Sequence, residues 1–394
     1  MHVRILCLVA AAAAALVAAC ATPSAPGKPE YMLVGIDTKV IFKDDGALQL
    51  LPPGKDSVAI VDIGTDPANP RVVAKLPLMN TVFGPPTNLA ITPDGTLALV
   101  ANSLDWTKDG ENWKFVPDDK LYVIDLTSNP PAHLETVTVG KQPSGLSINR
   151  AGNLALVANR ADNSVSVLSI RGKQVKLIDT VAMGDSVSAA VFTPDGKRAF
   201  ATKFPAHKVA LLGVDGEKVT YEKRDIPVGL WPYNLGVAAG GGLVLTADNG
   251  NTGRSDGNVD TVSVIDIEAN PPRLIDKVVV GDSPEGFAVS PSGNLAAAML
   301  LGGSDGPKNS WFYNRSGRVV TLKVDGKKVS KTGEVAVGAV PEGAVFSPDG
   351  RWLYVGNYAD SNISVLRVDG DTIVNTGVTV ALPGPPASMR GRVQ

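Results

Sequence analysis

The sequence predicts an all-β protein, a seven-bladed β-propeller built from four-stranded antiparallel blades. Two observations lead to this fold. Short apolar runs separated by turn residues recur along the chain, and no long helical pattern interrupts them. Successive copies begin at Pro86, Pro143, Val187, Pro232, Pro284 and Pro341. The period therefore ranges from 44 to 57 residues, which is typical of propellers, where radial packing of blades covers the faces that one sheet would expose.

The clearest copy, residues 143–183, shows the four strands of one blade, called a to d from the centre to the rim. LSI, LALVA and SVSVLSI are apolar or alternating runs, and a fourth run, VKLIDTVAM, follows them. The clusters RAGN, RADN and RGKQ separate these runs and supply the glycine, asparagine and aspartate that tight turns need. We therefore expect hairpins to join the four strands into one antiparallel sheet.

The other copies are recognised by the turn between strands a and b. They are ITPDGTLALVAN (91–102), INRAGNLALVAN (148–159), FTPDGKRAFATK (192–203), VAAGGGLVLTAD (237–248), VSPSGNLAAAML (289–300), FSPDGRWLYVGN (346–357) and a degenerate first copy, FKDDGALQLLPP (42–53). Residues 386–389 look like an eighth start. We expect this segment to pair with the N-terminal copy and close the ring, so that residues 31–394 form one domain of seven blades.

These copies resemble the repeats of the YVTN/YncE-like family, within the broader bacterial seven-bladed propellers that include lactonases. LVANRADNSVSVLSI, LYVGNYADSNISVLRV and TVSVIDI carry the resemblance, which covers nearly all of the chain after residue 30. It implies the fold. It does not select a function, because such folds host unrelated activities.

The N-terminus predicts export. A weakly basic start, an alanine-rich apolar run and small residues before Cys20 are typical of a cleaved signal, here residues 1–19. The end of this segment resembles a bacterial lipobox, which implies that Cys20 is lipidated; cleavage at alanine without a lipid is the alternative. Ala21 in place of aspartate favours an outer-membrane anchor facing the periplasm. Residues 20–30 form a tether rich in proline, serine and glycine.

Charge and composition exclude several function classes. The 37 basic and 39 acidic residues nearly cancel, which argues against nucleic acid as a partner. Cys7 leaves with the signal, so no disulfide or thiolate metal site is expected. The sequence contains no GxSxG, HExxH, CxxCH or phosphate-binding glycine motif. We therefore expect a monomer that requires no cofactor.

Three long loops between strands b and c, residues 102–119, 248–260 and 301–317, are predicted to crowd one face together with the crossovers from strand d to the next strand a. This face also gathers aromatic residues. We name as candidates for contact with a ligand or partner Trp106, Trp113, Trp231, Tyr233, Trp311 and Tyr313. The alternative is that they pack the loops onto the propeller.

Departures from the repeat mark a second set of candidates. At the end of strand b the copies carry Asn102, Asn159, Lys203, Asp248 and Asn357, and near the start of strand a they carry Asn234, Glu285 and Glu342. We expect both sets to face the mouth of the central channel, beside Arg160. Their oxygen atoms would suit a hard cation such as Ca²⁺. The alternative is that they hydrogen-bond neighbouring blades together.

Two functions remain open. The first is a binding or scaffold module that uses the long-loop face against a small molecule or a periplasmic protein. The second is a lactonase-like hydrolase at the channel mouth. In the hydrolase, Glu285, Glu342 or His207 would act as the base, and Arg160 or Lys203 would stabilise an oxyanion.

Overall fold

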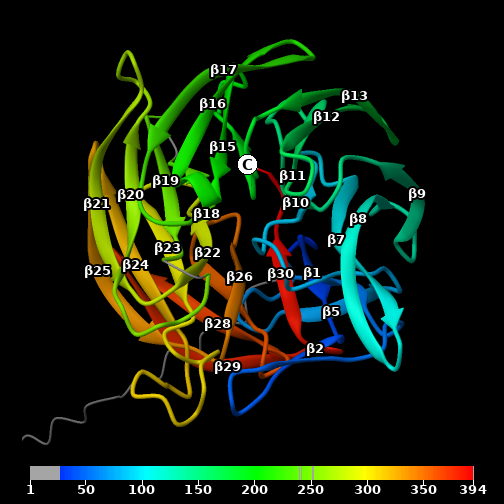
Figure 1. Ribbon diagram of the computed structural model, residues 1–394, viewed down its shortest axis with the longest axis vertical. Coiled ribbons are helices and arrows are strands. Elements are labelled where there is room, and N and C mark those ends of the chain that lie inside the picture. Colours follow the sequence, from blue (N-terminus) through cyan, green and yellow to red (C-terminus); the bar gives the residue numbers. More distant parts are fainter. Residues whose placement is uncertain (1–26, 239, 241, 251–252, 394) are drawn as a thin grey trace, which may run out of the picture.

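Seven four-stranded antiparallel sheets form a ring in the computed structural model, whose described residues are 27–238, 240, 242–250 and 253–393 (Figure 1). The ring is seen along its axis in Figure 1, and the expected seven-bladed propeller is confirmed. The predicted signal, residues 1–19, lies outside the described residues, as do Cys20 and the first part of the tether. No helix in the described part of the chain is both long and apolar enough to cross a membrane.

Six blades take their four strands in chain order. Blade 2 comprises β6 (Leu89–Ile91), β7 (Leu97–Asp109), β8 (Asn112–Asp125) and β9 (Ala132–Thr138); blade 3 comprises β10 (Pro143–Ile148), β11 (Leu154–Asn159), β12 (Ser164–Arg171) and β13 (Gln174–Ala182); blade 4 comprises β14 (Ala190–Phe192), β15 (Arg198–Lys203), β16 (Lys208–Asp215) and β17 (Lys218–Pro227). Blade 5 comprises β18 (Pro232–Val237), β19 (Leu243–Asp248), β20 (Asp260–Asp266) and β21 (Arg273–Gly281); blade 6 comprises β22 (Pro284–Val289), β23 (Leu295–Leu300), β24 (Arg318–Asp325) and β25 (Lys328–Ala336); blade 7 comprises β26 (Pro341–Phe346), β27 (Trp352–Asn357), β28 (Asn362–Asp369) and β29 (Thr372–Ala381). One short 3₁₀ helix, η1 (Phe204–Ala206), joins β15 to β16.

Blade 1 closes the ring by joining the two ends of the chain. Its order from the axis outward is β30 (Pro386–Arg390), β1 (Tyr31–Ile36), β4 (Ser57–Asp62) and β5 (Arg71–Leu76). Val34 pairs with Met389, and Figure 1 shows the red β30 beside the blue β1. The expectation that residues 386–389 pair with the N-terminal copy is therefore confirmed.

The assignment of residues 42–53 as the first copy of the a–b turn is wrong. They belong to a two-stranded hairpin, β2 (Val40–Phe42) and β3 (Leu48–Leu50), which is inserted between strands b and c of blade 1. Blade 1 has no a–b turn, because its strands a and b come from opposite ends of the chain. The Asp-Asp-Gly turn satisfied the search pattern because any tight hairpin uses the same turn residues.

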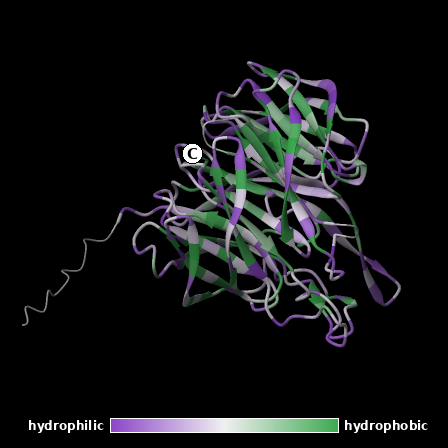
Figure 2. Cartoon of the chain, turned by 90° about the vertical axis from the view of Figure 1, so that its left-hand side faces the viewer, coloured by the Kyte–Doolittle hydropathy of each residue, from purple (hydrophilic) through white to green (hydrophobic). Residues whose placement is uncertain are grey.

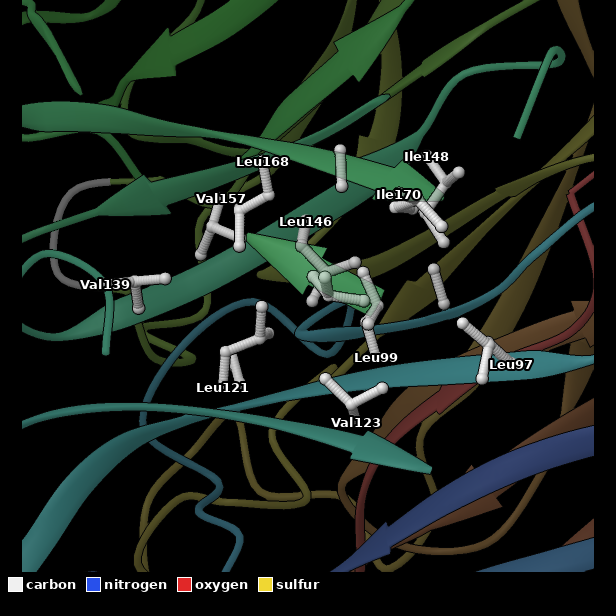
Figure 3. Close-up of a cluster of buried hydrophobic side chains, with 14 residues drawn as sticks. Leu97, Leu99, Leu121, Val123, Val139, Leu146, Ile148, Val157, Leu168 and Ile170 are labelled. Carbon is white, nitrogen blue, oxygen red and sulfur yellow. The ribbon is translucent and has the colours of Figure 1, made fainter. Parts of the chain in front are cut away.

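The core lies between blades. Seven apolar clusters of described residues each combine two neighbouring blades, and Figure 3 shows the cluster between blades 2 and 3. There Leu99 and Val123 face Leu146 and Val157. Strand b is buried along its whole length in this region, as the pattern of β11 shows, which explains its continuous apolar sequence. Strands d at the rim are largely exposed, and in Figure 2 hydrophilic segments interrupt the hydrophobic strands.

The two ends of the central channel differ. Each strand a runs from the side of the b–c loops, called here the loop side, to the side of the a–b turns, called the turn side. On the loop side, residues 102–119 do not form an irregular loop, because β7 and β8 continue their pairing out to Asp109 and Asn112. An eighth apolar cluster covers the loop side. This loop cap comprises Val40, Val82, Leu104, Trp106, Leu301, Val340, Tyr358 and Ala387.

Candidate functional site

Two sets of side chains meet at the loop side of the channel. The residue that follows strand b of one blade contacts the second residue of strand a in the next blade. Ser103 Oγ lies 2.8 Å from Ser144 Oγ, and Asn249 Nδ2 donates to Glu285 Oε2 at 2.6 Å. At the equivalent position of blades 4 and 5, the rings of Phe204 and Tyr233 are 6.0 Å apart. Each blade therefore positions a channel residue of its neighbour.

The last residues of strand b do not face the channel mouth, and that expectation is wrong. Asn159 Nδ2 donates to Ser164 Oγ and Ser166 Oγ of its own blade at 3.0 and 2.9 Å. The same contacts within one blade hold Asn102 to Asp118, Asn357 to Asn362 and Ser364, and Asp248 to Thr261 and Ser263. Successive side chains of a strand point in opposite directions, so the channel side belongs to the next residue along the chain.

Lys203 is the basic member of that set, and it also points away from the channel. Its ammonium donates to Tyr221 OH at 2.7 Å and to Asp225 Oδ2 at 3.0 Å, and both partners lie on the rim strand β17. Burial lowers the pKa of Lys203, but these two hydrogen bonds outweigh it and the net shift is upward. The expected convergence of Lys203 with Arg160 is therefore wrong.

Arg160, which follows strand b of blade 3, does reach the loop side of the channel. Its Nη1 donates to Tyr233 OH at 3.2 Å, and its guanidinium lies 4.8 Å from the centre of the Phe204 ring. Burial raises the pKa of Tyr233, so the phenol stays protonated and accepts from the arginine. Burial raises the pKa of Glu285, and the positive charge of Arg160 partly opposes this rise, so the two groups interact electrostatically.

Glu285 and Glu342 occupy the same position in strands a of blades 6 and 7, and they are 6% and 3% exposed. Glu342 Oε2 is buried and has no hydrogen-bond partner among the described residues. Burial, partly opposed by the bond from Asn249, raises the pKa of Glu285 to about 8. Burial and the neighbouring charge of Glu285 raise the pKa of Glu342 well above its usual range. At neutral pH the pair therefore carries at least one proton.

Asn249 and Asp305 belong to this site and were not among the sequence candidates. Asp305 is 2% exposed, and its charge raises the pKa of both glutamates. Arg254 Nε lies 3.5 Å from Asp305 Oδ2. Asn249 could have been found by comparing the residue after strand b in each copy. Asp305 lies within an unrepeated loop, so the repeat gave no signal for it.

His207 lies at the end of η1 with a positive φ of 58°, at the boundary between blades 4 and 5. Its Nδ1 accepts a hydrogen bond of 3.0 Å from the backbone N–H of Trp231. This contact holds the crossover that leads into β18. Asn234 is also buried, and its side-chain oxygen accepts from the N–H of Leu235 at 2.9 Å.

The candidate aromatic residues divide into buried and exposed members. Trp106 is 6% exposed and belongs to the loop cap, and Trp113 packs against that cap with Lys108 5.2 Å from its ring. Trp231 meets Phe204 edge-on at 5.0 Å. By contrast, Trp311 is 83% exposed, while Tyr313, two residues further along the same loop, is partly buried.

In the part of the chain that the structure describes, no group of three or more histidine, cysteine, aspartate or glutamate side chains could hold a metal ion. Asp256 and Asp260, which lie between β19 and β20 or at the start of β20, each accept a backbone hydrogen bond. Asp256 Oδ1 accepts from the N–H of Asn258, and Asp260 Oδ2 accepts from the N–H of Ser283, both at 2.9 Å. These carboxylates thus cap turns.

Comparison with solved structures shows which proteins share this fold. The Pseudomonas aeruginosa periplasmic gluconolactonase PpgL is 20% identical, with a TM-score of 0.65 over 93% of this chain and 99% of that one. A Bacteroides uniformis protein with a provisional assignment as a 6-phosphogluconolactonase is 16% identical, with a TM-score of 0.69 over 92% and 99% of the two chains. Kuenenia stuttgartiensis hydrazine synthase is 18% identical, with a TM-score of 0.60 over 79% and 90%.

Sequence comparisons add no family to these structural ones. A scan against protein-family models finds no match, and a search of curated proteins finds none either. At these identities the structural likeness establishes the fold alone. What it supports is a seven-bladed β-propeller of four-stranded blades whose structural neighbours include lactonase-like proteins.

Proposed function

We propose that the loop side of the central channel is an active site that hydrolyses a small lactone. The observation that carries this proposal is the buried pair Glu285 and Glu342, in which one carboxyl oxygen of Glu342 has no partner among the described residues. Burying such a pair is costly, and strongly shifted carboxyl groups gather at functional sites. Arg160 supplies a positive charge in the same electrostatic system.

The two carboxyl groups have different environments and so take different roles. Glu285 receives a hydrogen bond from Asn249 that favours its ionised form, whereas Glu342 Oε2 receives none. Glu285 is therefore the general base and Glu342 the proton carrier. A base with a pKa of about 8 is well matched to proton transfer near neutrality.

In the proposed reaction Glu285 takes a proton from water while the water oxygen adds to the lactone carbonyl carbon. The guanidinium of Arg160 stabilises the negative oxygen that forms. The bond between the carbonyl carbon and the ring oxygen then breaks, and Glu342 gives its proton to that oxygen. One water is consumed, and the product is the open-chain hydroxy acid. The proton that Glu285 took restores Glu342 through the pair or through solvent.

Two of the structural neighbours support the choice of substrate class, since their names refer to gluconolactone or its phosphate. We propose, in addition, that the chain belongs to the YVTN/YncE-like family of these propellers, because its repeats resemble the repeats of that family. Substrate must pass the loop cap to reach the glutamates, because both are almost fully buried. Loop movement on the loop side is therefore part of the proposal.

The test is hydrolysis of glucono-δ-lactone and other small lactones. The readout is the rate of acid release above the spontaneous rate. We expect Glu285→Gln and Glu342→Gln to lower kcat/KM by at least about 100-fold, the scale of general acid–base catalysis. Lys203→Gln is the control, because the Lys203 ammonium points away from the channel to Tyr221 and Asp225 on the rim strand β17. Folded glutamate variants that keep full activity, or a wild-type protein inactive on the whole panel, would overturn the proposal.

A second candidate, a protein-binding module, is favoured by the exposed apolar side chains of the loop side. Trp311, Val259 and Phe115 are 83%, 69% and 47% exposed. Exposed aromatic groups of this kind supply contact area to partners. Crosslinking through a photoreactive residue at position 259 would test it, and equally strong crosslinking of the same protein after Trp311→Ala is added would count against it.

We also propose that the chain is an exported lipoprotein anchored at Cys20 and facing the periplasm. The support is the sequence of residues 1–30 alone. Fractionation of cells that produce wild type and Cys20→Ser is the test. Release of the variant from the membrane fraction is expected, and equal retention of both would refute the anchor.

A further inference from the structure

The central channel has an opening at the turn side, away from the glutamates. It is a cavity of about 250 Å³. All seven inner strands reach it, together with the a–b turns and the segment that follows β30. Its walls are mainly apolar and include Ile148, Val237, Val289 and Phe346. The loop-side site does not share these residues.

The space arises at one level of the channel. The third residue of strand b pairs with an equivalent inner-strand residue in every blade, as Leu156 does with Ser147 and Leu33 with Arg390. The seven inner residues at this level are Ala90, Ser147, Val191, Gly236, Ala288, Val345 and Arg390. Six are small or apolar and leave the axis open. The seventh is an arginine.

Arg390 brings a charge into this apolar space without an acidic partner. Its Nε is buried and has no hydrogen-bond partner among the described residues, and no ion pair between described residues includes its guanidinium. The acid at the same end, Glu30, pairs with Arg392 at 2.8 Å. Burial lowers the pKa of Arg390 to about 10, so the guanidinium is still charged at neutral pH. Arg390 as a whole is partly buried, and an unpaired charge in such mainly apolar surroundings is costly unless an anion meets it.

We propose that this cavity binds a small organic monocarboxylate with an apolar body, whose carboxylate pairs with Arg390. The planar guanidinium matches a carboxylate in two parallel hydrogen bonds. Arg150, Arg392 and Glu30 also line the cavity, and Arg392 is already paired with Glu30. Arg390 balances one negative charge, whereas a phosphate dianion would bring a second charge against the apolar walls. The cavity volume lies just below the usual range of about 300–1,000 Å³ for ligand pockets, so the ligand must be small. This site is independent of the proposed lactone hydrolysis at the other end of the channel.

The experiment is calorimetric titration of the whole folded protein with benzoate, benzyl alcohol and inorganic phosphate. We expect benzoate to bind at one site, benzyl alcohol to bind at least about tenfold more weakly, and phosphate not to bind, because a charged hydrogen bond contributes more than one factor of ten. Arg390→Gln should weaken benzoate binding by at least about tenfold while leaving lactone hydrolysis unchanged. Arg171→Gln, at a surface arginine that is 73% exposed, is the matched control.

A second variant tests the cavity without touching the charge. Ser147→Leu enlarges the side chain from two heavy atoms to four at the level of Arg390 and should abolish benzoate binding by filling the space. Equal affinity of Arg390→Gln and wild type, equal affinity of Ser147→Leu and wild type, or no benzoate binding by wild type would each overturn the proposal. Binding of phosphate alone would also overturn it, because the ligand would then be an inorganic anion.

Discussion

Asn249 Nδ2 donates a hydrogen bond of 2.6 Å to Glu285 Oε2 across the boundary between blades 5 and 6. Both side chains are buried, and the same Asn249 amide group also donates to the backbone oxygen of Pro284 at 3.2 Å. The glutamate is therefore oriented by its neighbouring blade, and its ionised form is favoured by that blade as well. The packing between blades and the protonation of the channel are thus linked.

Asn249→Ala should raise the pKa of Glu285, because the variant removes the hydrogen bond that stabilises the carboxylate. The loss of one bond to a charged group corresponds to a shift of about one to two pKa units. In the proposed hydrolase, the acidic limb of the kcat/KM profile should move to higher pH by that amount. An unshifted limb in a folded Asn249→Ala protein would show that Glu285 is not the group that titrates.

The stability of the protein should fall as pH rises from about 4.5 to 8. Burial raises the pKa of Glu285 from 4.5 to about 8, so the folded state holds a proton that the unfolded chain has lost in this window. Stability from this group is complete below the unfolded pKa and is lost as pH rises through the folded one. Glu285→Gln removes the contribution of Glu285 to this fall, and the advantage of the variant over wild type at pH 8 should reach at most about 5 kcal/mol.

Urea denaturation at several pH values measures this difference. Glu217→Gln is the control, since Glu217 is 47% exposed and its substitution should leave the pH profile unchanged. Parallel profiles for wild type and Glu285→Gln would mean that the buried glutamate does not titrate as its surroundings require.

Lys203→Met should destabilise the fold by about 1–3 kcal/mol without changing the channel. The lysine side chain is 5% exposed, and its removal takes a donor from both Tyr221 OH and Asp225 Oδ2, while the bond from Tyr221 OH to Asp225 Oδ1 remains. The free energy of unfolding and the lactonase rate should be measured together. If the variant loses activity but keeps its stability, Lys203 takes part in the active site after all.

The loop cap offers a matched pair of tryptophan substitutions. Trp106→Ala should cost about 3–5 kcal/mol, because the ring is buried against Phe83 and lies 4.7 Å from the Lys39 ammonium. That lysine is itself buried and paired with Asp37 and Asp56. Trp311→Ala should change stability by less than about 0.5 kcal/mol, because its ring is 83% exposed. Thermal unfolding of the two variants measures the difference. Equal losses of stability would contradict the inference that the Trp106 ring is packed in the loop cap.

The fold could be predicted from the repeats because strand b is buried on both sides and follows a glycine turn in nearly every copy. The exception is blade 1, where closure of the ring separates strand a from strand b by almost the whole chain. A search for turns between consecutive strands cannot find that pairing, because the two strands lie near opposite ends of the chain. A hairpin in the b–c insertion carried the same turn residues and was assigned in its place.

The site could be predicted only in part. Glu285 and Glu342 stood out because they replace small residues at one position of strand a, and Tyr233 stood out as an aromatic residue of the long-loop face. The candidates at the end of strand b were displaced by one residue, which turns a side chain from the channel to its own blade. Arg390 was missed because its role depends on the closing strand, whose register appears only when β30 is paired with β1.

The closing strand also determines how the molecule presents itself to anything attached to it. Glu30 and Arg392 form an ion pair of 2.8 Å, so the described chain enters and leaves the ring at the same place, on the turn side. A tag, a resin or a sensor surface joined to either terminus would therefore hold the turn-side cavity toward the support and the loop side toward the bulk solution. Immobilisation at an engineered loop-side cysteine would reverse this orientation, and the choice decides which end of the channel a binding measurement samples.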